Sequence, residues 1–280
     1  MFQTFTIQKG KPISFSAFSI CYLLAFLTEI PELQNVILYV FLIQWVLFIP
    51  AYIFKTEKFY DLAGSSTYIF AVSYILYDSS QNLTNLILGT AIIVWAVRLG
   101  SFLFFRIKKA GEDKRFKEIK QSPTRFLLAW SLQGMWVSMC SLCALTALST
   151  ENGVVLNGYL YLGFGLFLTG FLIEIIADKQ KSKFRSNLDN KDKFINTGLW
   201  SKSRHPNYLG EIILWLGISI MSISSLSGLQ YLTLVSPLFT YLLLVYVSGV
   251  RLLEESGNKK WGHLNSYKEY VKNTPVLFFK

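Results

Sequence analysis

Charged residues are scarce in this 280-residue chain, at 16% of the total. Soluble domains carry about 25%, and disordered chains combine high charge with low hydrophobicity, so both classes are excluded. Cysteine is also rare, with three residues that all lie in apolar surroundings, which excludes a secreted disulfide scaffold. Asp, Glu, Lys and Arg are wholly absent from seven stretches: 12–28, 33–54, 62–77, 79–97, 126–150, 152–173 and 212–250.

These stretches predict membrane-spanning helices. A bilayer's hydrocarbon core requires roughly 20 apolar helical residues, and six of the stretches fit one crossing each. The last is 39 residues long and fits two crossings, 208–222 and 229–250, divided by the polar run 222–228. The sequence therefore predicts an all-α polytopic transmembrane bundle of about eight helices.

The distribution of positive charge predicts the orientation. With eight helices, one set of loops contains Glu29, Glu32, Asp78 and Glu151 and no Lys or Arg. All 27 Lys and Arg fall in the other set or at its helix ends, which the positive-inside rule places in the cytoplasm. Both termini are thus expected to be cytoplasmic, and the net charge of +10 requires no nucleic acid to explain it.

Cys140 and Cys143 have the C-x-x-C spacing of metal and redox pairs. They lie in the middle of an apolar stretch without nearby His, Asp or Glu, so two small apolar side chains on one helix are the favoured interpretation. No metal site is expected. The chain contains no internal repeat, P-loop or G-x-G-x-x-G motif. Its chemical information lies in three cytoplasmic segments, 106–125, 178–207 and 251–280, which are too short to form a core alone.

The segment 174–185 extends a transmembrane helix beyond the membrane edge. Glu174, Asp178, Lys181 and Arg185 have spacings of 4, 3 and 4, so they share one helix face. A solvated row of salt bridges is one interpretation, but Glu174 and Asp178 are like charges four residues apart, which mildly destabilise a helix. A ligand-binding face is the favoured alternative.

A helix start is predicted at Pro206, because proline favours the first helical position. Its free backbone N–H groups and positive dipole end face the cytoplasm, and Arg204 and His205 directly precede it. Together these features predict an anion site of the kind that binds phosphate. Asn207 and Glu211, four residues apart, share a face of this helix.

Four motifs in order give a specific resemblance. Arg-His-Pro-Asn-Tyr-Leu-Gly-Glu at 204–211, after Gly-Leu-Trp at 198–200, resembles the signature of steroid 5-alpha reductase-like membrane proteins, which are related to sterol C14 and C24 reductases. Asp-Leu-Ala-Gly at 61–64, the stretch 95–115 and Ala-Asp-Lys-Gln at 177–180 are similar to a branch whose substrate is mostly unassigned. The match predicts N-terminal transmembrane helices over 1–60, followed by a reductase-like domain over 61–280.

The resemblance implies an NADPH-dependent reductase that acts on a carbon–carbon double bond in a lipid or steroid-like substrate. It places cofactor-binding residues in the matching motifs and in the C-terminal tail. The cofactor-binding residues expected from the resemblance and from the helix-face and helix-start arguments are Arg106, Asp113, Arg115, Glu174, Asp178, Lys181, Arg185, Lys193, Arg204, His205, Asn207, Tyr208, Glu211, Arg251, Glu254, Tyr267 and Tyr270. An amphipathic tail lying on anionic headgroups is the alternative for the tail residues.

The catalytic acid is less well defined. Steroid-specific members carry Gln-Glu-Leu-Pro, whereas this chain has Glu-Ile-Pro-Glu at 29–32, on the predicted outer side. Asp61 is the nearest ionisable substitute, with Tyr68 as a neighbouring candidate near the polar end of the substrate. A helix N-cap is the alternative for Asp61.

Two other functions remain open. Isoprenylcysteine carboxyl methyltransferase-like proteins also have an Arg-His-Pro-x-Tyr helix start and bind S-adenosylmethionine. A lipid-binding membrane protein without enzymatic activity could keep the same fold. Asn207 and the pair Gly210–Glu211 favour the reductase interpretation.

Overall fold

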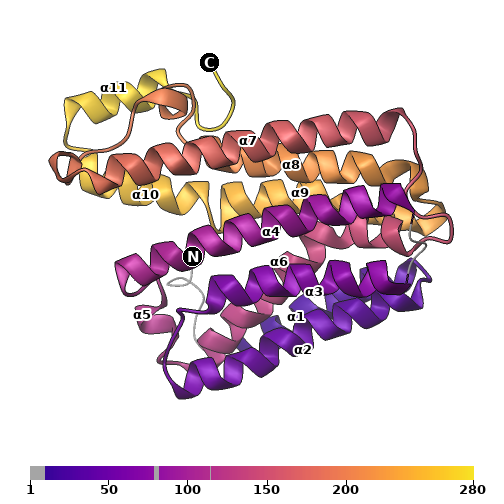
Figure 1. Cartoon of the computed structure of the whole chain (residues 1–280). Coiled ribbons are helices and arrows are strands. Elements are labelled where there is room, and N and C mark those ends of the chain that lie inside the picture. The colour runs from indigo at the N-terminus through magenta and orange to yellow at the C-terminus, as the bar shows by residue number, and fades with distance from the viewer. Residues whose placement is uncertain (1–9, 79–81, 114) are drawn as a thin grey trace. The chain divides into compact units, whose positions relative to one another are not determined.

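The computed structural model describes residues 10–78, 82–113 and 115–280, and the regular structure in these residues is helical throughout (Figure 1). The chain divides into two compact units. Of the described residues, those from 10 to 160 and 219–236 form the N-terminal unit, and 161–218 and 237–280 form the C-terminal unit. The predicted all-α fold class is confirmed, while a domain boundary after residue 60 stays a prediction.

The N-terminal unit is a helical bundle built around α6, which packs against α1, α2 and α3, while α4 packs against α3. Buried side chains follow α6 along nearly all of its length, because neighbours surround it. The helices of this unit are α1 (Gly10–Leu27), α2 (Pro31–Ile53), α3 (Tyr60–Asp78), α4 (Leu83–Ala110), α5 (Phe116–Ile119) and α6 (Pro123–Ser149), with the short turns η4 (Ile223–Ser225) and η5 (Gly228–Leu234).

The C-terminal unit combines long apolar helices with a polar, largely helical extension. Its elements are α7 (Gly158–Ser186), η2 (Leu188–Asn190), η3 (Gly198–Ser201), α8 (Pro206–Ser222), α9 (Val235–Leu242), η6 (Leu243–Val247), α10 (Val250–Trp261) and α11 (Asn265–Asn273). As predicted, α7 continues past its apolar stretch to Ser186, and α8 begins at Pro206.

Each of the eight predicted stretches contains a helix in its described residues, and the chain is a polytopic helical membrane protein. Within the described residues, six helices are long and apolar enough to cross a bilayer: Pro31–Ile53, Leu83–Ala110, Pro123–Ser149, Gly158–Ser186, Pro206–Ser225 and Gly228–Trp261. The described part of α1 is shorter, and α3 contains the polar run Gly-Ser-Ser-Thr at 64–67. The exact number of crossings and the orientation of the termini stay predictions.

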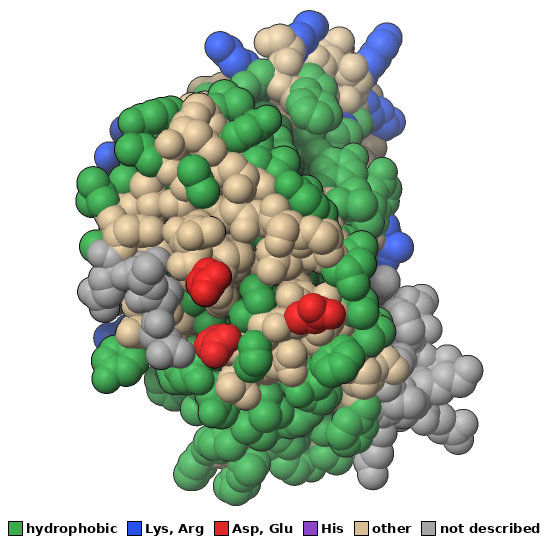
Figure 2. Space-filling view, turned by 90° about the vertical axis from the view of Figure 1, so that its right-hand side faces the viewer, with side chains coloured by type: hydrophobic (Ala, Val, Ile, Leu, Met, Phe, Trp, Pro, Cys, Tyr) green, Lys and Arg blue, Asp and Glu red, His purple; other side chains and the backbone are tan. Residues whose placement is uncertain are grey.

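The loops predicted to lie outside the cell or in the lumen all belong to the N-terminal unit. Hydrogen bonds join two of them: Asn82 donates to the carbonyl of Asn152, and the backbone N–H of Val154 donates to Asn85 at 2.7 Å. Figure 2 looks onto this end of the molecule and shows acidic side chains among hydrophobic and uncharged atoms, with the visible Lys and Arg at the rim. Residues 79–81 of the predicted loop 78–83 lie outside the described residues.

Glycines bring α7 and α8 into backbone contact within the C-terminal unit. A Cβ atom on Gly170 would lie 2.4 Å from the carbonyl oxygen of Gly210, and one on Gly210 would lie 2.6 Å from that of Gly170. One helical heptad further along, a Cβ on Gly217 would lie 2.5 Å from the carbonyl oxygen of Gly163. Small residues permit such an approach between membrane helices. The contact fixes the end of α7 beside the start of α8, where the candidate site begins.

Candidate functional site

A cavity of about 430 Å³ lies in the polar part of the C-terminal unit. Its walls come from the end of α7, the segment 190–195, the residues before α8, and helices α10 and α11. The lining includes six Lys or Arg residues against two carboxylates, so positive charge is in excess. The charged lining residues are Lys181, Arg185, Lys191, Lys193, Arg204, Lys260, Asp192 and Glu254.

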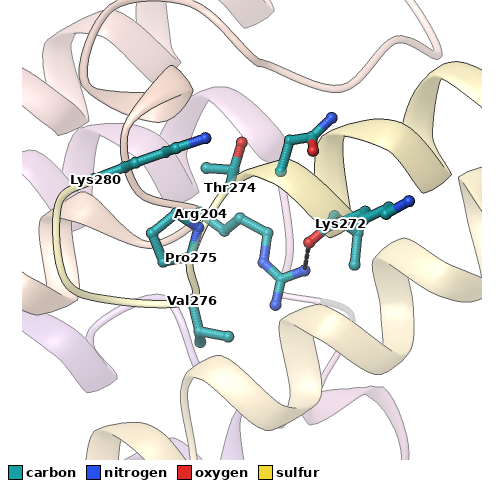
Figure 3. Close-up of a pocket in the computed structure, with 8 residues that line it drawn as sticks. Arg204, Lys272, Thr274, Pro275, Val276 and Lys280 are labelled. Atoms are coloured by element: carbon teal, nitrogen blue, oxygen red, sulfur yellow. Dashed lines mark hydrogen bonds between the residues drawn. The ribbon is translucent and has the colours of Figure 1, made fainter.

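At the start of α8, a carboxylate occupies the predicted anion site. Glu254 of α10 lies 3.2 Å from Nη2 of Arg204 and 2.7 Å from Nε2 of His205. Arg204 also donates from Nη1 to the carbonyl of Val271 at 3.1 Å, as the dashed line in Figure 3 shows. The segment before α8 is thereby joined to α10 and to the tail after α11, and an external anion would meet Glu254 as a competitor.

His205 is buried, and its ring stacks on Tyr208 with centroids 5.9 Å apart. Burial lowers the pKa of His205 below its ordinary value, and this effect outweighs the opposite influence of Glu254. The ring is therefore neutral at pH 7, and its Nε2–H donates to the Glu254 carboxylate. The other ring nitrogen, Nδ1, is buried without a hydrogen-bond partner in the described part of the chain.

Aromatic side chains form another part of the cavity wall. The ring of Phe194 lies 5.1 Å from that of Tyr267, 5.3 Å from that of Tyr270 and 6.0 Å from that of Trp261. Burial raises the pKa of both tyrosines above their ordinary value, so their hydroxyl groups stay protonated at neutral pH. The hydroxyl of Tyr270 donates to the carbonyl of Trp200 at 2.7 Å. Planar rings of this kind offer stacking surfaces for an aromatic ligand.

The structure brings eight of the predicted cofactor residues together in the lining of this cavity. These are Lys181, Arg185, Lys193, Arg204, His205, Glu254, Tyr267 and Tyr270. Six others belong to the same unit but do not line the cavity: Glu174, Asp178, Asn207, Tyr208, Glu211 and Arg251.

Those six residues lie in three environments: three are buried, Asn207 and Tyr208 are partly buried, and Arg251 is exposed. Glu174, Asp178 and Glu211 are buried at 2%, 7% and 5% exposure, so they belong to the interior of the unit rather than to a solvated stripe. Arg251 is exposed and lies 3.8 Å from Glu255 on the same helix. Asn207 has a buried side-chain oxygen without a hydrogen-bond partner among the described residues.

The remaining predicted cofactor residues form a second charged cluster, in the N-terminal unit. Arg115 pairs with Asp113, and this interaction lowers the pKa of Asp113 although burial alone would raise it. Arg106, Arg115 and Asp113 all act electrostatically on Asp61. Asp61 lies within the first turn of α3, which begins at Tyr60, so the alternative of an N-cap role is wrong.

Tyr68, the other catalytic candidate, is 5% exposed in the N-terminal unit. Its hydroxyl donates to the carbonyl of Trp136 at 3.3 Å, and its ring meets Trp95 edge-on at 5.1 Å. Helices α4 and α6 therefore hold this side chain from two sides. Its catalytic role, like that of Asp61, stays a prediction.

Sequence reasoning missed two participants. Phe194 is central to the aromatic wall, but a single phenylalanine after a run of charged residues carries no pattern. Glu57, 4% exposed, bonds to Lys120 at 2.7 Å and accepts from the backbone N–H of Asp113 at 3.0 Å, which fixes the loop after α4. Glu57 lies in a short loop between two charge-free stretches, and no motif in the sequence marks it as a contact residue.

Comparison with known proteins gives relatives of two kinds. The chain is 28% identical over 146 residues to 3-oxo-5-alpha-steroid 4-dehydrogenase 1 of Homo sapiens, covering 52% of this chain and 48% of the relative. It is 29% identical over 140 residues to a "Probable 7-dehydrocholesterol reductase" of Acanthamoeba polyphaga mimivirus, covering 44% and 29%. It is also 32% identical over 117 residues to a "Probable O-methyltransferase" of Ustilaginoidea virens, covering 36% and 41%.

The chain thus matches less than half the length of each of these three relatives. No solved structure matches it. A family model described as "Protein of unknown function (DUF1295)" matches residues 45–274, which include both charged clusters and the whole cavity. The resemblance to steroid 5-alpha reductase-like proteins is confirmed, and the chain belongs to the DUF1295 family of such membrane proteins.

Proposed function

We propose that this protein is a membrane-embedded, NADPH-dependent reductase that acts on a carbon–carbon double bond of a lipid or steroid-like substrate. Two of the relatives are named as a steroid dehydrogenase and a sterol reductase, and this supports an oxidoreductase acting on a CH–CH group. The observation that carries the proposal is the 430 Å³ cavity, in which an excess of positive charge adjoins aromatic rings.

The cavity fits the chemistry of NADPH. The cofactor carries a pyrophosphate and a further phosphate on its adenosine ribose, and Lys and Arg side chains bind such groups through charge-assisted hydrogen bonds. Lys260 pairs with Asp192 at 2.9 Å and Arg204 with Glu254, so the two lining carboxylates already have cationic partners. With six lining cations against two carboxylates, the lining keeps a net positive charge that favours phosphates.

The aromatic wall fits the planar rings of the cofactor. Phe194, Trp261 and Tyr267 provide stacking surface at the side of the cavity formed by the tail. When bound, NADPH supplies a hydride to one carbon of the double bond. The chain's own residues then orient the cofactor, exclude water and provide the proton for the other carbon, for which Asp61 and Tyr68 are the candidates.

The substrate is proposed to be hydrophobic and to arrive from the bilayer. Hydride transfer requires near contact between the nicotinamide ring and the reacting carbon. The cavity lies where α7, α8 and α10 emerge from their apolar stretches, in segments that the positive charge assigns to the cytoplasmic side. A polar substrate would have to lose its hydration to reach the interior between these helices, whereas a lipid enone is already dissolved there.

An S-adenosylmethionine-dependent methyltransferase is the second candidate, because one relative is named as an O-methyltransferase. The charge of the cavity argues against it. S-adenosylmethionine has no phosphate and carries a sulfonium cation, which the excess of Lys and Arg would repel. The reductase is therefore the better supported of the two.

Binding of NADPH, NADH and S-adenosylmethionine to the purified full-length protein in detergent would test the proposal. Lys181 lines the cavity and Lys183, two residues along α7, is exposed outside it, so Lys183→Gln is a matched control for Lys181→Gln. Loss of one charge-assisted contact should weaken NADPH binding about tenfold in Lys181→Gln and leave the control within about twofold.

Turnover is measured as NADPH oxidation in proteoliposomes that contain lipid enones. If the protein binds S-adenosylmethionine more tightly than NADPH, the methyltransferase is the better supported function. NADPH binding without oxidation of any lipid enone would point to the non-enzymatic alternative.

A further inference from the structure

A second cavity, of about 450 Å³, lies between Arg204 and the tail that follows α11. Its lining consists of Arg204, residues 271–276 and Lys280. In Figure 3, Arg204 and Thr274 lie between Lys272 and Lys280. Arg204 contributes to both cavities, but the other lining residues belong to this one alone.

The side chains that line this tail cavity carry positive charge, although Arg204 is also paired with Glu254 outside it. Three cationic side chains, Arg204, Lys272 and Lys280, line it, and no carboxylate side chain is found among its described lining residues. Two guanidinium nitrogens of Arg204 are bonded, to Val271 and Glu254, while its Nε–H is buried without an acceptor among the described residues. A buried donor without an acceptor is costly, and a negative charge in the adjoining cavity would offset that cost electrostatically.

Backbone hydrogen bonds hold the cavity together. The N–H of Arg204 donates to the carbonyl of Pro275 at 2.9 Å, and the N–H of Lys280 donates to that of Lys202 at 3.3 Å. The hydroxyl of Ser203 donates to the carbonyl of Val276 at 3.4 Å. These hydrogen bonds fix the tail along residues 202–204 at several points. The backbone alone therefore places Arg204, Lys272 and Lys280 around the same cavity.

The tail cavity lies near the predicted membrane boundary. Tyr270 bonds to the carbonyl of Trp200, whose indole N–H donates to the carbonyl of Ala177 at 3.1 Å. Ala177 is four residues after the end of the charge-free stretch 152–173, which is about 6 Å of helix. Lipid phosphates lie in the interfacial layer just outside the hydrocarbon core, at this level.

Exposed aromatic side chains accompany the cations. Phe278 is 72% exposed and Phe279 is 40% exposed, directly before Lys280. In a soluble protein two neighbouring exposed phenylalanines would be unfavourable, but beside basic residues they are typical of segments that insert into the interface of an anionic bilayer.

We propose that the tail cavity binds a phosphate group, and that the group belongs to an anionic phospholipid of the surrounding membrane. Arg204, Lys272 and Lys280 contact the phosphate, while Phe278 and Phe279 insert among the neighbouring acyl chains. The occupant of this site is neither substrate nor cofactor of the proposed reductase, although Arg204 lines both cavities.

Lipid binding to the full-length protein in detergent, followed by native mass spectrometry, tests this site without any nucleotide. The probes are phosphatidic acid, phosphatidylcholine, inorganic phosphate and glycerol 3-phosphate. The double variant K272Q/K280Q removes two lining charges, whereas K259Q/K268Q removes two exposed charges of α10 and α11 outside the cavity. Phosphatidic acid should bind K272Q/K280Q about tenfold more weakly than wild type, and K259Q/K268Q within about twofold of it.

The other probes identify the source of the phosphate. Lysine-dependent binding of phosphatidic acid, reduced in F278S/F279S and not matched by phosphatidylcholine, supports a lipid headgroup. Equal lysine-dependent binding of inorganic phosphate or glycerol 3-phosphate overturns the lipid source in favour of a soluble phosphate. If K272Q/K280Q and K259Q/K268Q bind every probe alike, the tail cavity is not a phosphate site.

Discussion

Replacing Gly170 by alanine should disrupt the contact between α7 and α8. The added Cβ would lie 2.4 Å from the carbonyl oxygen of Gly210 and 2.5 Å from the backbone nitrogen of Leu214, distances that real Cβ atoms essentially never show. Both neighbours are backbone atoms, so no side chain can rotate away. To reach 3.4 Å, where ordinary van der Waals contact begins, the helices must separate by about 1 Å.

The expected cost follows from the size of this clash. Overpacking destabilises a well-packed core by about 1–3 kcal/mol, and a backbone clash belongs at the upper end of that range. Gly165 on the same helix supplies the control, because a Cβ there meets nothing within 4 Å. Alanine at this exposed position should stabilise the helix by roughly 0.5–1 kcal/mol, so the two variants should differ by about 1.5–4 kcal/mol.

The assay is thermal unfolding in detergent, followed by tryptophan fluorescence, since Trp200 and Trp215 are buried in the C-terminal unit. Gly170→Ala should unfold at a lower temperature than wild type and Gly165→Ala at the same or a higher one. NADPH binding should weaken only in Gly170→Ala, because the end of α7 and the residues directly before α8 both line the cavity. Equal stability of the two variants would refute the backbone contact.

Three further predictions concern other parts of the chain. Because the pKa of His205 is lowered in the folded state, the unfolded state binds a proton at higher pH than the folded state does. The stability of the fold is therefore complete above the ordinary histidine pKa of about 6.5 and falls as the pH decreases through that value. Between pH 7 and pH 5.5, the melting temperature should fall less in His205→Gln than in wild type. Asp61→Asn should bind NADPH normally but lose reductase activity if Asp61 donates the proton, and full NADPH oxidation in lipid enone assays would exclude that role. Single cysteines at Asn152 and Ser186, in a chain without its native cysteines, should be labelled from opposite sides of the membrane, and labelling from one side would contradict the eight-helix topology.

The sequence predicted the positions of the helices well, because lipid excludes charge from any segment that crosses it. It did not predict where α4 ends, since a helix can continue as a polar element in water. The charge-free stretch 79–97 gives no sign of helix beyond residue 97, yet α4 runs to Ala110. The continuation of α7 to Ser186 was predicted, because the spacing of its charged residues places them on one helix face. The hydropathy of a segment shows which part of it lies in the bilayer, whereas the capping residues determine where the helix ends.

The site was predictable where one short motif carries it and unpredictable where distant segments meet. Pro206, Arg204 and His205 are neighbours in sequence, so the helix start and its charges could be read directly. Glu254 lies 49 residues from His205, and its place between Arg204 and His205 depends on how α10 returns to the start of α8. The role of Gly170 was equally hidden, because a glycine in an apolar helix has no signature until its neighbour is known.

The long sequence separation of the contacts around the two cavities has a consequence for biosynthesis. Trp200 is held by Tyr270, 70 residues later, and Ser203 by Val276, 73 residues later. At about 5–20 residues per second, the ribosome reaches these partners roughly 4–14 s after it has made Trp200. The glycine contact between α7 and α8 requires only Gly210, so this helix pair can assemble in the membrane first. Both cavities are therefore completed only after residues 267–280 have been made, later than the pairing of α7 and α8.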